Sequence, residues 1–330
     1  MRLLAAIMLA CGLTAGVGCR RAADVPRARS PEPEPAARQL SVDNLMLGQP
    51  ARASHAIALV AELPEHRFYR PLIREAQSAA ERLGASLEVH APDGDDNSAS
   101  QAQIVRDLVD REIKAIVIVP AAPAALAPAL RYAQQRGVTM VVVDRRVPTI
   151  AAAGFVGADD EQGGAAAGAV LIDALGGVGD VAILISESDD ENAATARRAF
   201  ESAVAGKLTV VDVETVVGDG SAAVVNLQQA YPELRGIFAA SDRITGIRML
   251  MADGGSQSSR VLISGGGESG SPVTAARYVA YVEVHRHPGL MGRYGVALAV
   301  RALEGSVPKG GEMLIDGTPT MGAPIPGLPQ

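Results

Sequence analysis

The chain has 330 residues, with 37 acidic and 30 basic side chains and a formal net charge of −7. Because this balance is acidic and the lysines and arginines are spread along the chain, the composition argues against a nucleic-acid-binding surface. There is no tryptophan, and six tyrosines and four phenylalanines are the only aromatic residues. So few aromatic rings also argue against a protein that stacks single-stranded bases.

The first residues predict export. Met1 and Arg2 give a short positive start, and residues 3–13 form an apolar run. This run is shorter than the roughly 20 residues that a membrane-spanning helix needs, and it is typical of a signal peptide. Small residues then lead to Cys19, and this segment resembles a bacterial lipoprotein processing site with Cys19 as the lipidated first residue of the mature chain. The alternative is an ordinary secretory signal cleaved near the same place.

Cysteine usage and composition extend this interpretation. The two cysteines are Cys11, inside the apolar run, and Cys19, so the mature chain offers Cys19 no disulfide partner. Residues 25–49 contain closely spaced prolines and glutamates without an apolar period, which is typical of an unfolded spacer. We therefore predict a signal peptide over 1–18 and a disordered lipoprotein tether over 19–53.

Apolar strands and amphipathic helices alternate along the rest of the chain. Residues 56–60, for example, are continuously apolar, as in a strand buried on both faces of a parallel sheet. Helix-period segments of 10 to 15 residues separate such runs, which indicates βαβ units. A first series has strands at 56–60, 86–90, 115–119 and 138–143 and helices at 70–83, 99–111 and 124–136. A second series has strands at 181–186, 208–217, 236–240 and 261–264 and helices at 162–175, 193–204, 222–231 and 244–253. We predict an α/β protein with two similar doubly wound parallel-sheet lobes.

Several short strings occur in a characteristic order. They are Ile57-Ala-Leu-Val, Phe68-Tyr69, Val143-Asp144-Arg145, Ala158-Asp159-Asp160, Phe238-Ala-Ala-Ser241-Asp242 and Val300-Arg-Ala-Leu-Glu-Gly305. From Ile57 to about Pro308 the chain resembles the type I periplasmic binding proteins, in particular the ribose-binding-like components of sugar ABC transporters.

The resemblance implies a three-segment hinge, with the chain crossing between lobes near 157–159, 283–286 and 309–312. The lobes are then expected to be 54–157 with 286–308, and 158–285 with 309–330. Ligands of such sheets bind at the carboxyl ends of the strands, and closure around the ligand is a hinge motion.

The implied function is that of an extracytoplasmic solute-binding protein that captures a small sugar-like ligand and delivers it to an ABC permease. The alternative partner is a membrane sensor without transport. No nucleophile, base and orienting group can be named together, so we expect no enzyme activity. We also expect no cofactor, no nucleic acid, a monomer, and a periplasmic or cell-envelope location on a lipid anchor.

The resemblance also implies the ligand contacts, which are His66, Phe68, Tyr69, Asp144, Arg145, Ser241 and Arg286. An aromatic face packs on the apolar face of a sugar ring, although either aromatic residue is equally consistent with a helix-start core position. Asp144 and Arg145 place a carboxylate beside a guanidinium, which suits neighbouring hydroxyls. Their alternative role is a salt bridge at the lobe edge.

Three departures from the family pattern bear on the ligand. Val119 stands where the ribose-like group has an asparagine, Gly265 to Gly267 replace an aspartate, and Arg286 replaces a glutamine. Fewer acceptors and an added guanidinium favour a ligand with a carboxylate or phosphate, such as a sugar acid. The alternative is that Arg286 is paired with Asp144 or Glu283 and does not meet the ligand.

Two further patterns have competing interpretations. Residues 265–270 satisfy G-x-G-x-x-G after a strand, but they lie late in the second series, so a flexible loop is favoured over a dinucleotide site. His285 and His287 share a strand face and, with His66, form a candidate metal site, which is the less favoured hypothesis because no cysteine or carboxylate motif accompanies them.

Overall fold

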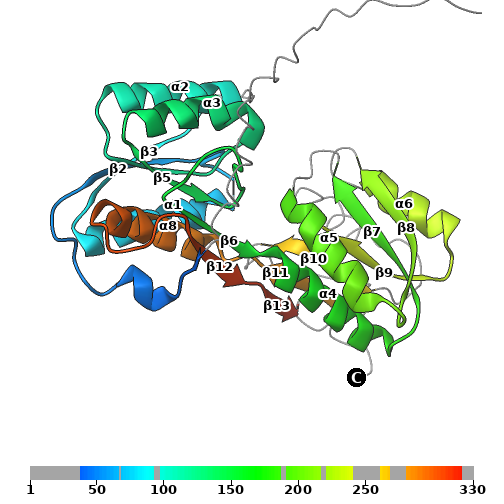
Figure 1. The fold of residues 1–330 in the computed structure, drawn as a ribbon. Coiled ribbons are helices and arrows are strands. Elements are labelled where there is room, and N and C mark those ends of the chain that lie inside the picture. Colours follow the sequence, from blue (N-terminus) through cyan, green and yellow to red (C-terminus); the bar gives the residue numbers. More distant parts are fainter. Residues whose placement is uncertain are drawn as a thin grey trace, which may run out of the picture. The chain divides into compact units, whose positions relative to one another are not determined.

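The computed structural model describes residues 38–66, 68–92, 97–186, 191–216, 221–240, 261–267 and 280–321. Within these ranges, no helix is both long and apolar enough to cross a membrane. The predicted Cys19 anchor, the site residue Ser241 and the helix at 244–253 lie outside the described residues. The alternation of strands and helices in the described part confirms the predicted α/β class with parallel sheets (Figure 1).

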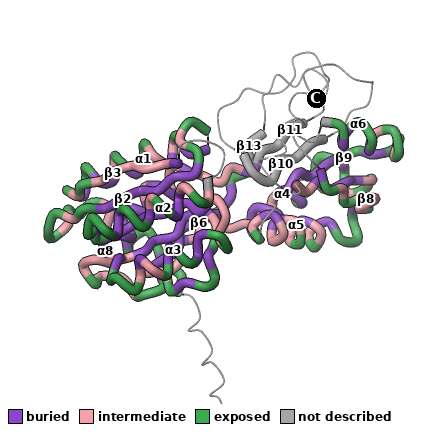
Figure 2. The backbone as a smooth tube through the Cα atoms, turned by 90° about the horizontal axis from the view of Figure 1, so that it is seen from above, coloured by how far each residue is buried: buried purple, intermediate pink, exposed green. Residues whose placement is uncertain are grey.

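Among the described residues, the first sheet has seven strands, and all of its pairings are parallel. In spatial order the strands are β1 (Arg38–Gln39), β12 (Gly311–Asp316), β6 (Gly154–Asp159), β5 (Thr139–Val143), β4 (Ala115–Ile118), β2 (Ala56–Val60) and β3 (Ser86–His90). The central strands β2, β4 and β5 are almost entirely buried (Figure 2), as their continuous apolar runs predict.

Two helix pairs cover the two faces of this sheet (Figure 1). On one face α1 (Tyr69–Leu83) and α8 (Pro288–Leu303) pack against alternate strand residues such as Leu59 and Val117. On the other face α2 (Asn97–Asp110) and α3 (Pro123–Gln135) pack against the intervening residues, such as Val60 and Ile118. Residues distant in sequence, from α1 and α8, therefore share one core.

The second sheet has six strands, in the order β13 (Thr318–Met321), β11 (Ala280–His285), β10 (Val261–Gly267), β9 (Leu234–Ala239), β7 (Asp180–Ser186) and β8 (Thr209–Val216). Its pairings are parallel except that β13 runs antiparallel to β11. Helices α4 (Asp160–Leu175) and α5 (Glu191–Val204) pack on one face, and α6 (Ser221–Ala230) packs on the other. Gly164 lets α4 and α5 approach, because a Cβ there would lie 2.1 Å from the Ala196 carbonyl oxygen.

In the part of the chain that the structure describes, three connections join the two sheets. The first follows β6 into α4 at Asp160, and the second follows β11 into α8 through Arg286 and His287. The third lies at Gly317, between β12 and β13, and not at 309–312 as expected. The expected position is wrong because β12 extends the first sheet, pairing with β6 from Gly311 to Asp316. Sequence periodicity does not reveal which sheet a terminal strand joins.

The predicted tether over 19–53 is corrected in its described part. Strand β1 pairs with β12, and Leu40 and Leu45 are buried in the core beside α8. Leu45 belongs to a short 3₁₀ helix, η1 (Val42–Leu45). The proline-rich composition concealed these two leucines, whose burial offsets the entropy lost when the segment is ordered.

Candidate functional site

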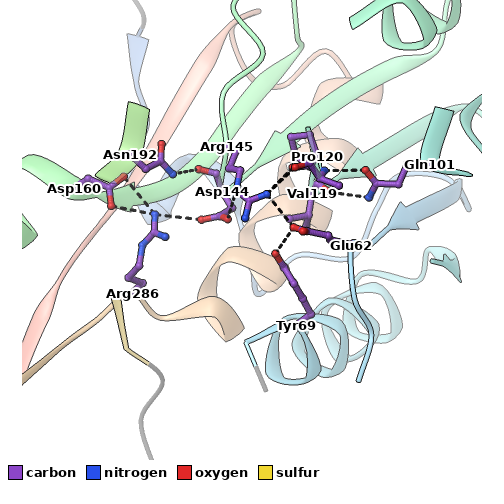
Figure 3. Close-up of polar contacts among 11 residues, drawn as sticks. Glu62, Tyr69, Gln101, Val119, Pro120, Asp144, Arg145, Asp160, Asn192 and Arg286 are labelled. Carbon is purple, nitrogen blue, oxygen red and sulfur yellow. Dashed lines mark hydrogen bonds and ion pairs between the residues drawn. The ribbon is translucent and has the colours of Figure 1, made fainter. Parts of the chain in front are cut away.

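Polar side chains converge where β2, β4 and β5 end in the first sheet (Figure 3). We name the five charged residues Glu62, Asp144, Arg145, Asp160 and Arg286 the Asp144 cluster. They come from the ends of β2 and β5, the start of α4 and the connection after β11. Carboxyl ends of parallel strands are where open α/β sheets bind ligands.

Asp144 lies at the centre of this cluster and has an unusual backbone. It follows β5 with a φ of 70°, in the left-handed region, and its side chain is almost fully buried. Its main-chain N–H donates to the Val156 carbonyl oxygen at 2.9 Å. Aspartate is among the residues that tolerate this conformation best, and strain of this kind is concentrated at functional sites.

Arg145 is held by acceptors from two other strand ends. Its Nη1 donates to Glu62 Oε2 at 3.0 Å, to the Pro120 carbonyl oxygen at 3.2 Å and to the Ala121 carbonyl oxygen at 3.1 Å. Glu62 is 5% exposed, and its Oε2 also accepts a hydrogen bond from the Tyr69 hydroxyl at 2.5 Å. The guanidinium is therefore positioned by the fold before any ligand binds.

Gln101 fixes the positions of the groups that accept hydrogen bonds from Arg145. This fully buried side chain on α2 donates from Nε2 to the carbonyl oxygens of Ala61 (2.8 Å) and Val119 (2.9 Å), and its Oε1 accepts from the Ala121 N–H (2.9 Å). These bonds join the ends of β2 and β4, which carry the acceptors of Arg145. Val119, expected at the ligand, is itself fully buried in the core.

The Tyr69 hydroxyl keeps its proton in this environment and therefore acts as a hydrogen-bond donor. Burial raises the pKa of its hydroxyl well above the usual range, and the negative charges of Asp144 and Glu62 raise it further. The Phe68 ring lies edge-on to Tyr69 with centroids 5.2 Å apart. Both residues are buried in the core of the first sheet, 3% and 5% exposed. Both side chains therefore pack in the core, and their role as ligand contacts stays a prediction.

Arg286 connects the sheets through two carboxylates. Its Nη2 lies 3.2 Å from Asp144 Oδ1 and 3.0 Å from Asp160 Oδ1, and it donates to Asp160 Oδ2 at 3.3 Å (Figure 3). This is the paired arrangement that the sequence left open as the alternative to a free guanidinium. The Asn192 amide on α5 adds a hydrogen bond of 2.8 Å to the Asp144 carbonyl oxygen.

The predicted histidines border this network, because the His66 ring lies 5.8 Å from the Tyr69 ring and His285 and His287 flank Arg286 in the chain. His66 is exposed, and its Nδ1 accepts a 3.3 Å hydrogen bond from the Phe68 N–H. The His285 and His287 rings lie 4.3 Å apart, and His287 Nε2 lies 2.9 Å from Thr318 Oγ1. Burial lowers the pKa of both imidazoles. Among the described residues, no cluster of histidines, cysteines and carboxylates is arranged to hold a metal ion.

The start of the G-x-G-x-x-G pattern lies in a strand and not in the flexible loop that the sequence favoured. Gly265 to Gly267 continue β10, and Gly267 pairs in register with His285. The first part of the G-x-G-x-x-G pattern is therefore a strand, and not a loop that opens a helix.

Sequence reasoning missed Glu62, Gln101, Asp160 and Asn192 as site residues. Glu62 had a readable signal, since it follows the apolar run 56–60 much as Asp144 follows 138–143. Gln101 had none, because a glutamine on a helix is ordinarily exposed. Its burial depends on which strand ends the helix covers.

Two parallel α/β sheets joined by three connections, with polar groups at the strand ends, define a two-lobed binding protein. The chain belongs to the periplasmic binding protein family, whose domain model matches residues 57–306. The ribose import binding protein of Escherichia coli is 27% identical over 261 residues, which cover 77% of this chain and 87% of that protein. The D-allose-binding periplasmic protein of the same organism is 25% identical over 274 residues, covering 78% and 88%.

Solved structures agree on the fold. A solute-binding protein of an ABC transporter from Burkholderia graminis, in complex with D-arabinose, superposes with a TM-score of 0.68 at 21% identity and covers 81% of this chain and 94% of that chain. A periplasmic ribose ABC transporter protein from Conexibacter woesei has a TM-score of 0.72 at 15% identity, covering 82% and 93%. At such identities the likeness concerns the fold.

Proposed function

We propose that this protein captures a small sugar-like ligand at the Asp144 cluster, between its two lobes, and delivers it to an ABC permease in the cell envelope. One observation carries the proposal. Asp144 Oδ1 is buried and accepts no hydrogen bond, although Arg286 lies within ion-pair distance. The ion pair alone leaves this buried oxygen without a hydrogen bond, which a ligand hydroxyl would donate.

The relatives support a sugar as the ligand and an ABC transporter as the partner. The most similar proteins described above are named for ribose import and for D-allose binding, and import favours a permease over a sensor as the partner. Ligand contacts are proposed for Asp144, Arg145 and Arg286, with Glu62 and Tyr69 orienting them. The family resemblance alone supports three further proposed contacts, which are Phe68, His66 and Ser241.

Thermal denaturation in the presence of single sugars tests this function. D-ribose, D-allose, D-arabinose and D-tagatose are the first candidates, with polyols and disaccharides as the wider set. A ligand present at 100 times its dissociation constant adds about 2.7 kcal/mol to the free energy of unfolding. Asp144→Asn should remove the shift, whereas the exposed Asp173→Asn on α4 should keep it. If no sugar raises the melting temperature of the wild type, the proposed ligand class is wrong.

The lipid anchor on Cys19 and the monomeric state belong to the same proposal. A binding protein held near a membrane permease needs no second subunit to present its ligand. Cys19→Ala should leave export intact but release the protein from the membrane fraction, and radioactive palmitate should label the wild type alone. Light scattering of the protein without its first 36 residues should give the monomer mass. A wild-type protein that is soluble and unlabelled would contradict the anchor.

A further inference from the structure

Direct contacts between protein groups join the two lobes around Asp144. The Asn192 side-chain amide donates to the Asp144 carbonyl oxygen at 2.8 Å, and Arg286 Nη2 lies 3.2 Å from Asp144 Oδ1 and 3.0 Å from Asp160 Oδ1. We name these contacts the interlobe contacts (Figure 3). Each of them joins two groups of the protein itself, so none depends on a ligand. Their consequence for ligand affinity rests on the proposed function.

The hydrogen bond of Asn192 lies away from the connections between the sheets. Those connections follow β6, β11 and β12, whereas Asn192 is on α5, which packs on the second sheet. Asp144 follows β5 of the first sheet. A hinge rotation about the connections therefore changes the separation of Asn192 and Asp144. Because a hydrogen bond is lost beyond about 3.5 Å, this bond exists only in one arrangement of the lobes, which we name the closed form.

The connections themselves are tied to one another and act as one pivot. Gln162 Oε1, near the start of α4, accepts a hydrogen bond from the Gly317 N–H at 2.7 Å. His287 Nε2 lies 2.9 Å from Thr318 Oγ1. The segments are also closely packed, since a Cβ at Gly317 would lie 2.6 Å from Val284 Cγ1. Opening the lobes therefore separates α5 from the end of β5 instead of stretching the connections.

Arg286 adds a charged contact to the closed form. Its side chain is 13% exposed, and those of Asp144 and Asp160 are 4% and 15% exposed. Charges so far from water are weakly screened, and a buried charge that loses its partner is left uncompensated. The guanidinium therefore favours the arrangement in which Asp144, from the first sheet, lies near Asp160, at the start of α4.

We propose that the interlobe contacts populate the closed form in the absence of ligand, and that Asn192 is a positioning residue which sets ligand affinity without touching the ligand. The apparent dissociation constant is the intrinsic one divided by the fraction of molecules in the binding-competent form. A contact that raises this fraction therefore raises affinity. Asn192 uses the main-chain carbonyl of Asp144, so it does not compete with a ligand for the carboxylate.

Distances between spin labels on the two lobes test the proposal. The labels are placed by Ala125→Cys on α3 and Ala222→Cys on α6, two exposed positions soon after the ends of β4 and β8, in a chain whose own Cys11 and Cys19 are changed to alanine. The protein is refolded from denaturant to free it of bound sugar. Double electron–electron resonance should then show a short-distance population besides a longer one. The sugar found by thermal denaturation should increase the short-distance population.

Variants of the interlobe contacts should shift this balance. Asn192→Ala should lower the ratio of short-distance to long-distance molecules about two- to tenfold, which corresponds to one neutral hydrogen bond. Its affinity for the sugar should fall in proportion to the short-distance fraction. Arg286→Met should lower the ratio as well, which keeps the test decisive if the first variant does not fold. Because Arg286 is also a proposed ligand contact, only the label distances of this variant are informative.

Glu191→Gln is the matched control. It changes the same turn of α5 as Asn192→Ala, but the Glu191 side chain is 76% exposed and pairs with Arg198 of its own helix. The label distances and the affinity of this variant should equal those of the wild type.

The outcomes separate this inference from the function on which it rests. Label distances that are the same in the wild type, Asn192→Ala and Arg286→Met overturn the inference, and so does a single long distance in the wild type without sugar. A loss of affinity in Asn192→Ala without a change in the short-distance fraction assigns Asn192 to the ligand and also overturns it. If no sugar binds the wild type, the proposed function is wrong, whereas the distances measured without sugar still decide the inference.

Discussion

The side-chain amide of Asn192 donates a 2.8 Å hydrogen bond to the main-chain carbonyl of Asp144. Asn192 lies on α5, which packs on the second sheet, whereas Asp144 follows β5 of the first. The bond therefore joins the two sheets at Asp144. Because it uses the main-chain carbonyl, it does not involve the side-chain carboxylate that pairs with Arg286.

Asn192→Ala should weaken ligand binding about two- to tenfold, since one neutral hydrogen bond contributes about 0.5 to 1.5 kcal/mol. The melting temperature without ligand should stay close to that of the wild type, because the bond lies between sheets and outside either core. Titration calorimetry and thermal denaturation measure the two quantities. Gln134→Ala removes a similar amide-to-carbonyl bond, to Ala151, within the first sheet's own lobe, and should leave affinity unchanged.

Gln101→Leu should impair both stability and binding. Two buried hydrogen bonds and one partly buried hydrogen bond are lost, and main-chain groups are left without these partners, which costs about 3 kcal/mol in the free energy of unfolding. Ligand affinity should fall as well, because the acceptors of Arg145 move. Urea denaturation and calorimetry measure both effects.

A double-mutant cycle with Arg145→Ala separates positioning from general destabilisation. If Gln101 acts on the ligand through Arg145, then Gln101→Leu in the Arg145→Ala background should lower affinity no further. Additive losses of affinity would instead assign Gln101 a purely structural role.

Arg301→Met should detach the N-terminal segment from α8. This almost fully buried arginine donates from Nε to the Leu45 carbonyl oxygen at 3.1 Å and from Nη2 to that of Met46 at 2.9 Å. It also pairs with Glu304 at 2.7 Å. Breaking a buried pair of this kind costs about 3 to 5 kcal/mol, and protease sensitivity near residues 46–52 should rise.

The matched control for this change is Arg131→Met on the exposed side of α3, which should alter stability by less than about 0.5 kcal/mol. Equal stability and unchanged proteolysis of Arg301→Met and wild type would show that the segment is not held by this arginine.

Stability should fall as the pH is lowered through the range in which free histidine titrates. Burial lowers the pKa of His285, as does the neighbouring His287, and burial lowers the pKa of His287. The unfolded chain, with histidine pKa values near 6.5, then binds protons at a higher pH than the folded chain. Protonation therefore favours unfolding as the pH falls below about 7.

Chemical denaturation at pH 7.5, 6.5 and 5.5 measures this effect. The variant His285→Gln with His287→Asn should lose less stability over the range than the wild type, and asparagine suits the φ of 55° at position 287. Glu75 does not titrate in this pH range. The hydrogen bond from Arg293 lowers the pKa of its carboxyl, so the stability that its charge contributes is lost only below about pH 4.5. Parallel curves for variant and wild type would contradict the role of the histidines.

Much of the fold was readable from local patterns. The apolar runs and helix-period segments predicted strands β2 to β5 and β7 to β10 and helices α1 to α6, because burial of a strand on both faces leaves a continuous apolar signature. They did not predict β6, β11, β12, β13 or helix α8. The sequence also placed Asp144 and Arg145 at a strand end, where ligand sites form. Residues 309–316 were assigned to the second lobe, but β12 belongs to the first sheet, which it joins only through long-range main-chain pairing.

The sequence by itself determined the α/β class, the order of elements and the presence of charged groups at the strand ends, because these depend on local periodicity and chain order. Only the tertiary structure decided the partner of each charge. Arg286 was read as a free guanidinium for an anion, but folding places it between Asp144 and Asp160. Pairing energies depend on distances of a few ångströms between residues far apart in the chain, and no local pattern encodes those distances.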